Sequence, residues 1–151
     1  MKLLTCTNTA LLDTSLLLLR LAVGIILFVA GAGKVMGWFG GQGIDATIDI
    51  FVSKMGIHPI LAYLSCYTEF IGGFLLIVGL LTRPAAFAIT INMLVATVLM
   101  LPNGFMTGAS YPFSVMVSSL VILLAGPMAY SLDAWLLSGR KESAGFKPVL
   151  R

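Results

Sequence analysis

The 151-residue chain is too apolar for a water-soluble protein. Hydrophobic residues make up 59% of it and charged residues only 10%, whereas a soluble domain carries about 25% charged residues. Its mean hydropathy is +1.04. The formal net charge of +3 comes from Lys and Arg that are scattered or lie at the ends of apolar segments, so it does not indicate a nucleic-acid-binding surface. We expect one domain that is integral to a lipid bilayer.

Four apolar stretches predict transmembrane helices. They cover residues 16–35, 60–81, 84–101 and 113–129, and each approaches the length of about 20 residues that crosses the hydrocarbon core. A helix satisfies its own backbone hydrogen bonds, as lipid requires. Thr82, Arg83 and Pro84 leave room only for a tight turn between the second and third spans. The predicted fold is therefore all-α, a four-helix transmembrane bundle over residues 1–151.

The connection between the first two spans predicts a short amphipathic helix. It starts with a glycine-rich run, residues 37–43. Apolar residues then recur at helical spacing, namely Ile44, Ile48, Phe51, Val52 and Met55, and polar residues mark the opposite face, namely Asp45, Asp49, Ser53 and Lys54. Two placements fit this pattern: a helix in the outer membrane interface with Trp38 as an anchor, or a helix packed across the mouth of the bundle.

The distribution of Lys and Arg predicts the orientation of the bundle. One side receives Lys2, Arg20, Arg83, Arg140, Lys141, Lys147 and Arg151, and the other receives Lys34 and Lys54. Cytoplasmic segments carry the excess of positive charge. We therefore expect both termini in the cytoplasm, the last of them as a basic tail over residues 138–151.

Glu69 is the most informative residue, because it lies near the middle of the second span. A charged carboxylate in the bilayer is costly, so it must face protein or water, be protonated, or find a partner. Small residues on its helical face, such as Cys66 and Gly73, mark that face as interior. The third span has a matching stripe at spacing four, Ala88, Asn92 and Ala96, which predicts that Asn92 neighbours Glu69. Glu69 is then either a proton-handling or ligand-binding carboxylate, the one candidate catalytic residue, or a structural acid that fixes helix register.

Lys34 ends the first span and has two possible fates. Its ammonium either reaches out to the interface or points inward and pairs with Glu69. In the second case a mouth above the pair would offer rings and donors to a quinone or a small anion; the residues expected to line it are Trp38, His58, Tyr63 and Tyr67. For His58 alone, a plain helix-entry residue is the competing interpretation.

At the opposite end, Arg20, Arg83 and Asp133 are predicted to form a structural ion-pair cluster that ties three helices together. Cys6 and Cys66 are far apart, and with a single histidine the chain offers few ligands for a metal, a haem or an iron–sulfur cluster. We expect no metal site, so a redox centre would be a quinone or belong to a partner.

Several short motifs together resemble the DoxX family of small membrane proteins. They are Gly31-Ala32-Gly33-Lys34, the run from Gly37 to Gly43, Glu69-Phe70-Ile71-Gly72-Gly73, Gly79-Leu80-Leu81-Thr82-Arg83 and Ser131-Leu132-Asp133. The resemblance implies a four-helix protein of the bacterial or archaeal inner membrane, related to subunits of thiosulfate:quinone oxidoreductase. It matches Lys34, Glu69, Arg83 and Asp133 to the polar signature positions of the family. One departure is Ala30, where many members have a histidine.

Three functions follow from these features. The first is a subunit of a quinone-linked redox complex, with Lys34 and Glu69 lining a pocket; the chain would be an enzyme only as part of such a complex. The second is a non-catalytic scaffold that recruits soluble redox or sulfur-metabolism proteins through its basic tail. The third is a small-molecule transporter, because a midplane carboxylate is also typical of coupling sites. Four helices are few for transport, so this function would require a homo-oligomer.

Overall fold

The computed structural model describes residues 9–126 and 131–133, and this part of the chain is helical without strands. The long helices are α1 (Thr9–Met36), α3 (Pro59–Val78), α4 (Thr82–Met100) and α5 (Ser110–Ala125). Four segments are long and apolar enough to cross a membrane: Leu11–Met36, Pro59–Val78, Thr82–Asn103 and Phe105–Ala125. The all-α membrane bundle predicted from the sequence is confirmed.

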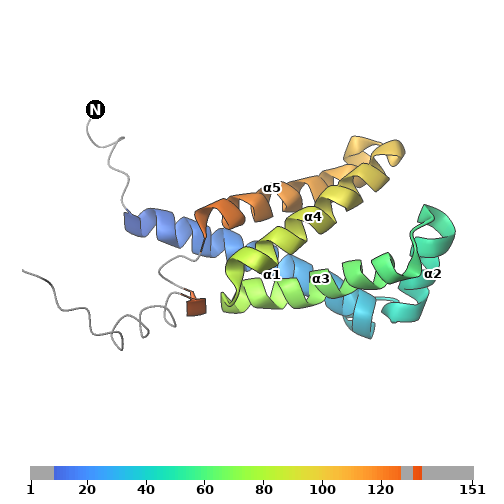
Figure 1. Ribbon diagram of the computed structural model, residues 1–151, viewed down its shortest axis with the longest axis horizontal. Helices are drawn as coiled ribbons and strands as arrows, with labels where there is room; N and C mark the ends of the chain where they lie inside the picture. Colours follow the sequence, from blue (N-terminus) through green and yellow to red (C-terminus); the bar gives the residue numbers. More distant parts are fainter. Residues whose placement is uncertain (1–8, 127–130, 134–151) are drawn as a thin grey trace, which may run out of the picture.

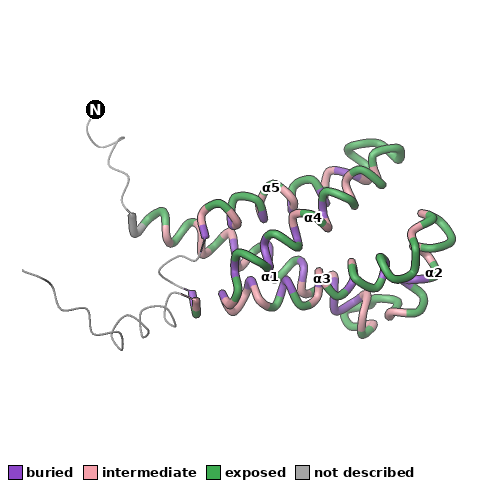
Figure 2. The backbone as a smooth tube through the Cα atoms, in the orientation of Figure 1, coloured by how far each residue is buried: buried purple, intermediate pink, exposed green. Residues whose placement is uncertain are grey.

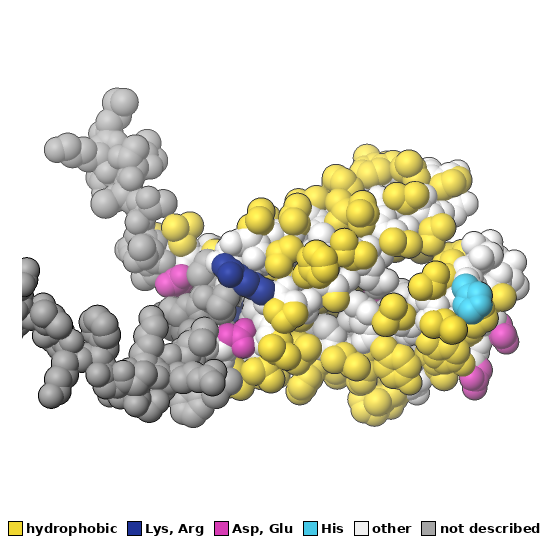
Figure 3. All heavy atoms as spheres, viewed as in Figure 1, with side chains coloured by type: hydrophobic (Ala, Val, Ile, Leu, Met, Phe, Trp, Pro, Cys, Tyr) yellow, Lys and Arg dark blue, Asp and Glu magenta, His cyan; other side chains and the backbone are white. Residues whose placement is uncertain are grey.

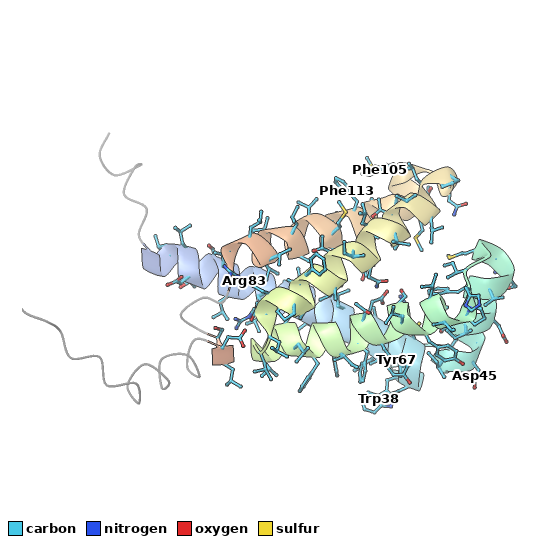
Figure 4. All side chains as sticks on the ribbon, in the orientation of Figure 1. Trp38, Asp45, Tyr67, Arg83, Phe105 and Phe113 are labelled. Carbon is cyan, nitrogen blue, oxygen red and sulfur yellow. The ribbon has the colours of Figure 1, made fainter. Side chains whose placement is uncertain are left out.

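The helices pack as two antiparallel units. Helix α1 lies along α3, α4 lies along α5, and α3 and α4 join the two units (Figure 1). Figure 4 shows Arg83 near one end of the bundle, whereas Trp38 and Asp45 lie toward the other. We call these the Arg83 end and the α2 end. Among the described residues, Lys34 and Lys54 lie in the segments near the α2 end, and Arg83 lies at the other end. The other basic residues, apart from Arg20, lie outside the described residues, and the orientation of the bundle stays a prediction.

A central core fills the space between the four long helices. Its buried members are Val23, Leu27, Leu76, Ala85, Ala86, Ile89, Met93, Val115 and Ile122. Figure 2 shows the buried residues on the inner faces of the helices and the exposed ones outside. In Figure 3 hydrophobic side chains cover the middle of the visible face, and charged side chains gather toward the two ends. Such an apolar belt is what a lipid-facing surface requires.

The fourth span begins earlier than the sequence predicted. Helix α5 starts at Ser110, and a π-helical turn, Phe105–Ala109, precedes it. A short 3-10 helix, η3 (Leu101–Asn103), links this turn to α4. Pro112 lies in the first turn of α5, shortly after the π-helical turn. The predicted end of this span, residues 127–129, lies outside the described residues.

The buried face of α4 is rotated relative to the predicted one. Ala88 is exposed, whereas Ile89 and Met93 are buried. Helix α5 packs on this second face, where Thr90 Oγ1 and Ser119 Oγ lie 2.9 Å apart in a hydrogen bond. Asn92 is therefore at the edge of the buried face.

Helix α2 (Gly43–Met55) packs against the ends of α1 and α3, and whether it also lies in the membrane interface stays a prediction. Its Ile48 is buried together with Ala62 and Cys66 of α3. Asp45 and Asp49 are exposed, as its amphipathic pattern predicted. A glycine-rich link containing the 3-10 turn η2 (Trp38–Gly40) joins α1 to α2.

Candidate functional site

Glycines bring the backbones of α1 and α3 into direct contact. A Cβ on Gly31 would lie 2.4 Å from the Phe70 nitrogen, and one on Gly73 would lie 2.5 Å from the Phe28 nitrogen. The rings of Phe28 and Phe70 stack at a centroid distance of 5.2 Å. Small residues at such crossings permit close helix approach in membranes. Lys34 is one turn beyond Gly31, so this crossing determines where its side chain lies relative to α3.

Lys34 and Glu69 form an ion pair within the membrane-spanning segments. Lys34 Nζ donates to Glu69 Oε1 at 2.7 Å and to Oε2 at 2.5 Å. The Glu69 side chain is 6% exposed and that of Lys34 is 31% exposed. Of the two orientations predicted for the Lys34 side chain, the structure therefore shows the inward one, paired with Glu69. The ammonium neutralises the buried carboxylate, while one side of the lysine remains accessible.

Asn92 lies beside the helix that carries Glu69. Its Nδ2 donates to the Ser65 carbonyl of α3 at 3.5 Å, one turn before Glu69. Both oxygens of Glu69 accept from Lys34 instead. Asn92 thus links α4 to α3, and a role in binding a ligand stays a prediction.

An open cleft of about 410 Å³ lies next to the ion pair, between α1, η2 and α2. The residues that matter most for its chemistry are Val29, Ala30, Lys34, Trp38, Phe39 and Phe51. Lys34 Nζ lies 5.8 Å from the centroid of the Phe51 ring, within range of a cation–π interaction.

The wall formed by η2 is held against α1 through glycine contacts. A Cβ on Gly41 would lie only 2.1 Å from the Gly33 carbonyl oxygen, so the two backbones touch. Phe39 has a left-handed backbone (φ 55), a conformation that costs a non-glycine residue about 1 kcal/mol or more. Its side chain is 72% exposed. The turn thus holds an aromatic ring at the rim of the cleft despite that cost.

The structure separates the other residues predicted to line a mouth. Trp38 lines the cleft, whereas His58, Tyr63 and Tyr67 lie outside it. Figure 4 shows Tyr67 on the outside of α3, and its side chain is exposed. His58 precedes α3 as its N-cap, and its Nδ1 accepts a hydrogen bond from the Ile60 N–H at 3.4 Å. His58 is therefore a helix-entry residue.

Sequence reasoning missed Phe39 and Phe51 as lining residues. A usable signal existed for Phe51, because it lies on the apolar face of the predicted amphipathic helix and that face must pack on something. The glycine-rich run around Phe39 was also visible, but its contact with Gly33 is a tertiary one.

At the Arg83 end, Asp133 acts as a helix cap. Its Oδ1 accepts from the Leu81 N–H and its Oδ2 from the Thr82 N–H, both at 2.8 Å, and its own N–H donates to the Gly79 carbonyl. These amides start α4, whose own N-cap residue provides no side-chain hydrogen bond. Burial alone would raise the pKa of the Asp133 carboxyl, but the hydrogen bonds from Thr82 and Leu81 and the charge of Arg20 together lower that pKa below its ordinary value.

The two arginines of the predicted cluster contact glycines at the helix ends. A Cβ on Gly79 would lie 2.8 Å from Arg20 Nη1, and one on Gly126 would lie 2.7 Å from Arg83 Nε. Arg20 is buried and Arg83 is exposed. The structure thus brings Arg20 and Asp133 to the α3–α4 turn and places Arg83 against the end of α5. Ion pairing among all three stays a prediction.

A family model named DoxX matches residues 15–102, more than half of the chain. The chain belongs to the DoxX family. It is 35% identical to a Bacillus subtilis (strain 168) protein named "Putative oxidoreductase CatD", over 83% of this chain and 90% of that protein. It is 30% identical to "Inner membrane protein YqjF" of Escherichia coli (strain K12), over 82% of this chain and 93% of that protein.

No solved structure matches this DoxX-family chain significantly. Within residues 9–126 and 131–133, no group of His, Cys, Asp and Glu is arranged to hold a metal ion. Ala30 lines the cleft.

Proposed function

We propose that this protein is a membrane subunit of a quinone-linked oxidoreductase, and that the Lys34–Glu69 ion pair binds the quinone head group. One observation carries the proposal: a charged pair lies within the membrane-spanning segments and its lysine is accessible from an aromatic-lined cleft. Ionisable residues inside a membrane are costly and mark functional sites by default. The name of the Bacillus subtilis relative, "Putative oxidoreductase CatD", supports the redox class.

In this proposal the two residues have different roles. An ammonium group has three N–H donors, and Glu69 uses two of them, so Lys34 can donate the third to a quinone carbonyl. Reduction of a quinone to a hydroquinone takes two electrons and two protons. A partner protein supplies the two electrons and water supplies the two protons. Lys34 passes an N–H proton to the quinone oxygen and is reprotonated from water at the exposed part of its side chain, while Glu69 holds the ammonium in place.

The test is to purify the protein from native membranes and quantify bound quinone and thiosulfate-dependent quinone reduction. Lys34→Met and Glu69→Gln should each lower quinone occupancy and reduction at least roughly tenfold, which corresponds to about 1.4 kcal/mol. The matched controls are Lys54→Met and Asp45→Asn, since both side chains are exposed on α2. Absence of quinone from the parent protein, or equal loss in the control variants, would contradict the proposal.

The anchoring of Asp133 favours a second candidate, a scaffold that recruits soluble redox partners. Asp133 fastens the chain to the α3–α4 turn, so the segment that follows starts from a fixed point. That segment contains Arg140, Lys141, Lys147 and Arg151 and lies outside the described residues. On the proposed orientation this basic tail is cytoplasmic.

Truncation after Asp133 separates the two candidates. A scaffold should lose its co-purifying soluble proteins while the truncated bundle keeps its thermal unfolding midpoint in detergent. Unchanged co-purification would exclude recruitment through the tail. Retained quinone binding in the truncated protein would support the first candidate.

A further inference from the structure

The charge of the ion pair limits what its neighbouring cleft can bind. Lys34 and Glu69 compensate each other, so the pair is neutral as a unit. An anion added beside it in a low-dielectric site would leave one negative charge uncompensated. A neutral carbonyl or ether oxygen can accept the third lysine N–H without that penalty. The pair therefore favours a neutral, hydrogen-bond-accepting head group over an anion.

The walls of the cleft favour a flat or bulky apolar group next to that acceptor. Trp38 and Phe39 of η2 and Phe51 of α2 line the cleft together with Lys34, and the Phe51 ring lies beside the lysine Nζ. Trp38 is 53% exposed, so a face of its ring is available for stacking. The cleft has a volume of about 410 Å³ and is open.

The route into the cleft leads from the bilayer. Val29 and Ala30 form one wall and belong to a membrane-spanning segment. Val29 is exposed, as is Ile26 one turn before it on α1, so an apolar strip of helix surface connects the cleft to the lipid. On the other side of the ion pair, toward the Arg83 end, the central core fills the bundle with Leu27 and Leu76.

We propose that this cleft is a binding site for a lipid-phase amphiphile with a neutral, hydrogen-bond-accepting head group, which enters sideways from the bilayer along Val29. The head group faces Lys34, the aromatic residues lie beside it, and the apolar tail lies along the Ile26–Val29 strip of α1. This inference rests on the proposed function and adds the place of the apolar tail, the route of entry and the cleft residues that set specificity.

Trp38 is a built-in reporter for this site. The chain has two tryptophans, so a Trp135→Phe background leaves Trp38 as the only one. The protein is placed in lipid nanodiscs, and Trp38 fluorescence is titrated with three probes. These are a decyl-substituted benzoquinone, the same benzoquinone without its chain, and decanoate. We expect saturable quenching by the first probe and at least roughly tenfold weaker binding of the other two.

Two variants change the cleft without touching the ion pair. Ala30→Phe should fill it and weaken decyl-benzoquinone binding roughly tenfold. Phe39→Gly should weaken binding several-fold, by the loss of one aromatic contact, while it relieves the left-handed backbone at that position. Loss of binding in Phe39→Gly therefore does not reflect unfolding. The matched controls are Ala88→Phe and Phe87→Ala, which change exposed positions on α4.

The outcomes distinguish this inference from the proposed function. If Lys34→Met abolishes binding but Ala30→Phe and Phe39→Gly bind like the parent, the inference that the ligand binds in the cleft is refuted, and binding at the ion pair is still supported. If the chainless benzoquinone or decanoate binds as tightly as the decyl-benzoquinone, the lipid-phase neutral ligand is overturned. If the decyl-benzoquinone binds in the cleft but Lys34→Met and Glu69→Gln leave native quinone reduction unchanged, the inference is supported and the proposed function is refuted.

Discussion

The α1–α3 pair and the α4–α5 pair are both antiparallel pairs of membrane-spanning helices, but different contacts hold them together. Helices α1 and α3 meet backbone to backbone at Gly31 and Gly73, and a charged pair lies one turn further along. Helices α4 and α5 meet through larger apolar side chains and one hydroxyl pair, Thr90 with Ser119. In lipid, apolar surface alone does not drive helices together, so close packing and polar contacts must do so.

The difference indicates which unit carries the function. A backbone contact leaves little freedom for side chains on either helix to shift, so it suits residues that must keep a fixed separation. The Lys34–Glu69 ion pair lies at that contact. The α4–α5 contact is made by side chains, which can shift, and it is sufficient for packing. We therefore expect the α4–α5 contact to tolerate substitution better than the α1–α3 contact.

The largest effect should come from adding a single methyl group at the α1–α3 contact. In Gly31→Ala the new Cβ meets backbone atoms of Phe70 that cannot rotate away, so the helices must separate. We expect a loss of unfolding free energy at the upper end of the about 1–3 kcal/mol typical of overpacking, measured as unfolding in mild detergent. Ala22→Leu, exposed on the same helix, is the control. Equal stability of Gly31→Ala and the parent would refute the close contact.

The next largest effect should come from breaking the ion pair on one side only. Lys34→Met leaves a buried, unpaired carboxylate; removing one partner of a buried pair costs about 3–5 kcal/mol. Because the Lys34 side chain is 31% exposed, we expect less, about 1–3 kcal/mol. The double variant Lys34→Met with Glu69→Leu should recover most of the loss. Additive losses in this double-mutant cycle would show that the two side chains do not interact.

A third effect should appear at the turn that joins the two units. Asp133→Ala removes the cap of α4 and should cost about 1 kcal/mol. Because the pKa of the Asp133 carboxyl is lowered in the folded protein, its contribution is complete above the ordinary Asp value and is lost as the pH falls through the folded-state pKa. The difference in unfolding free energy between parent and variant should therefore be constant near neutral pH and should disappear at acidic pH. A gap that widens on acidification would contradict this role.

The smallest effect should come from the α4–α5 contact. Ser119→Ala removes the hydrogen bond to Thr90, and such bonds between membrane helices average about 0.6 kcal/mol. The control is Ser114→Ala, since Ser114 is exposed and bonds only locally to Ser110 in the described contacts. A loss as large as that of Gly31→Ala would remove the contrast between the two contacts.

Residues of the site differed in how far the sequence revealed them. Glu69 was evident because a carboxylate in an apolar span is rare and needs an explanation. The sequence did not decide the orientation of Lys34, because a lysine at the end of a span can either reach the interface or turn inward to pair with an acid. The prediction for α4 was wrong because the small residues Ala88 and Ala96 suggested the interior face, whereas the buried residues are Ile89 and Met93.

The cap at Asp133 shows a different limit. Capping residues are read from sequence because they normally stand next to the helix they cap. Leu81 holds that place for α4, and the cap comes from a residue 52 positions later. Only the folded chain brings Asp133 to the start of α4. From the sequence, the charge of Asp133 suggested an ion pair with the arginines instead of a helix cap.

The sequence by itself determined the number of spans, the amphipathic helix before α3 and the presence of an intramembrane acid. Hydropathy and helical periodicity are local properties, and lipid allows a chain of this composition few other folds. The tertiary structure alone decided that Lys34 turns inward, that η2 rests on α1, and that Trp38, Phe39 and Phe51 form a cleft beside the ion pair. These features depend on which faces of helices meet and how closely, and a few glycine contacts between distant residues set both.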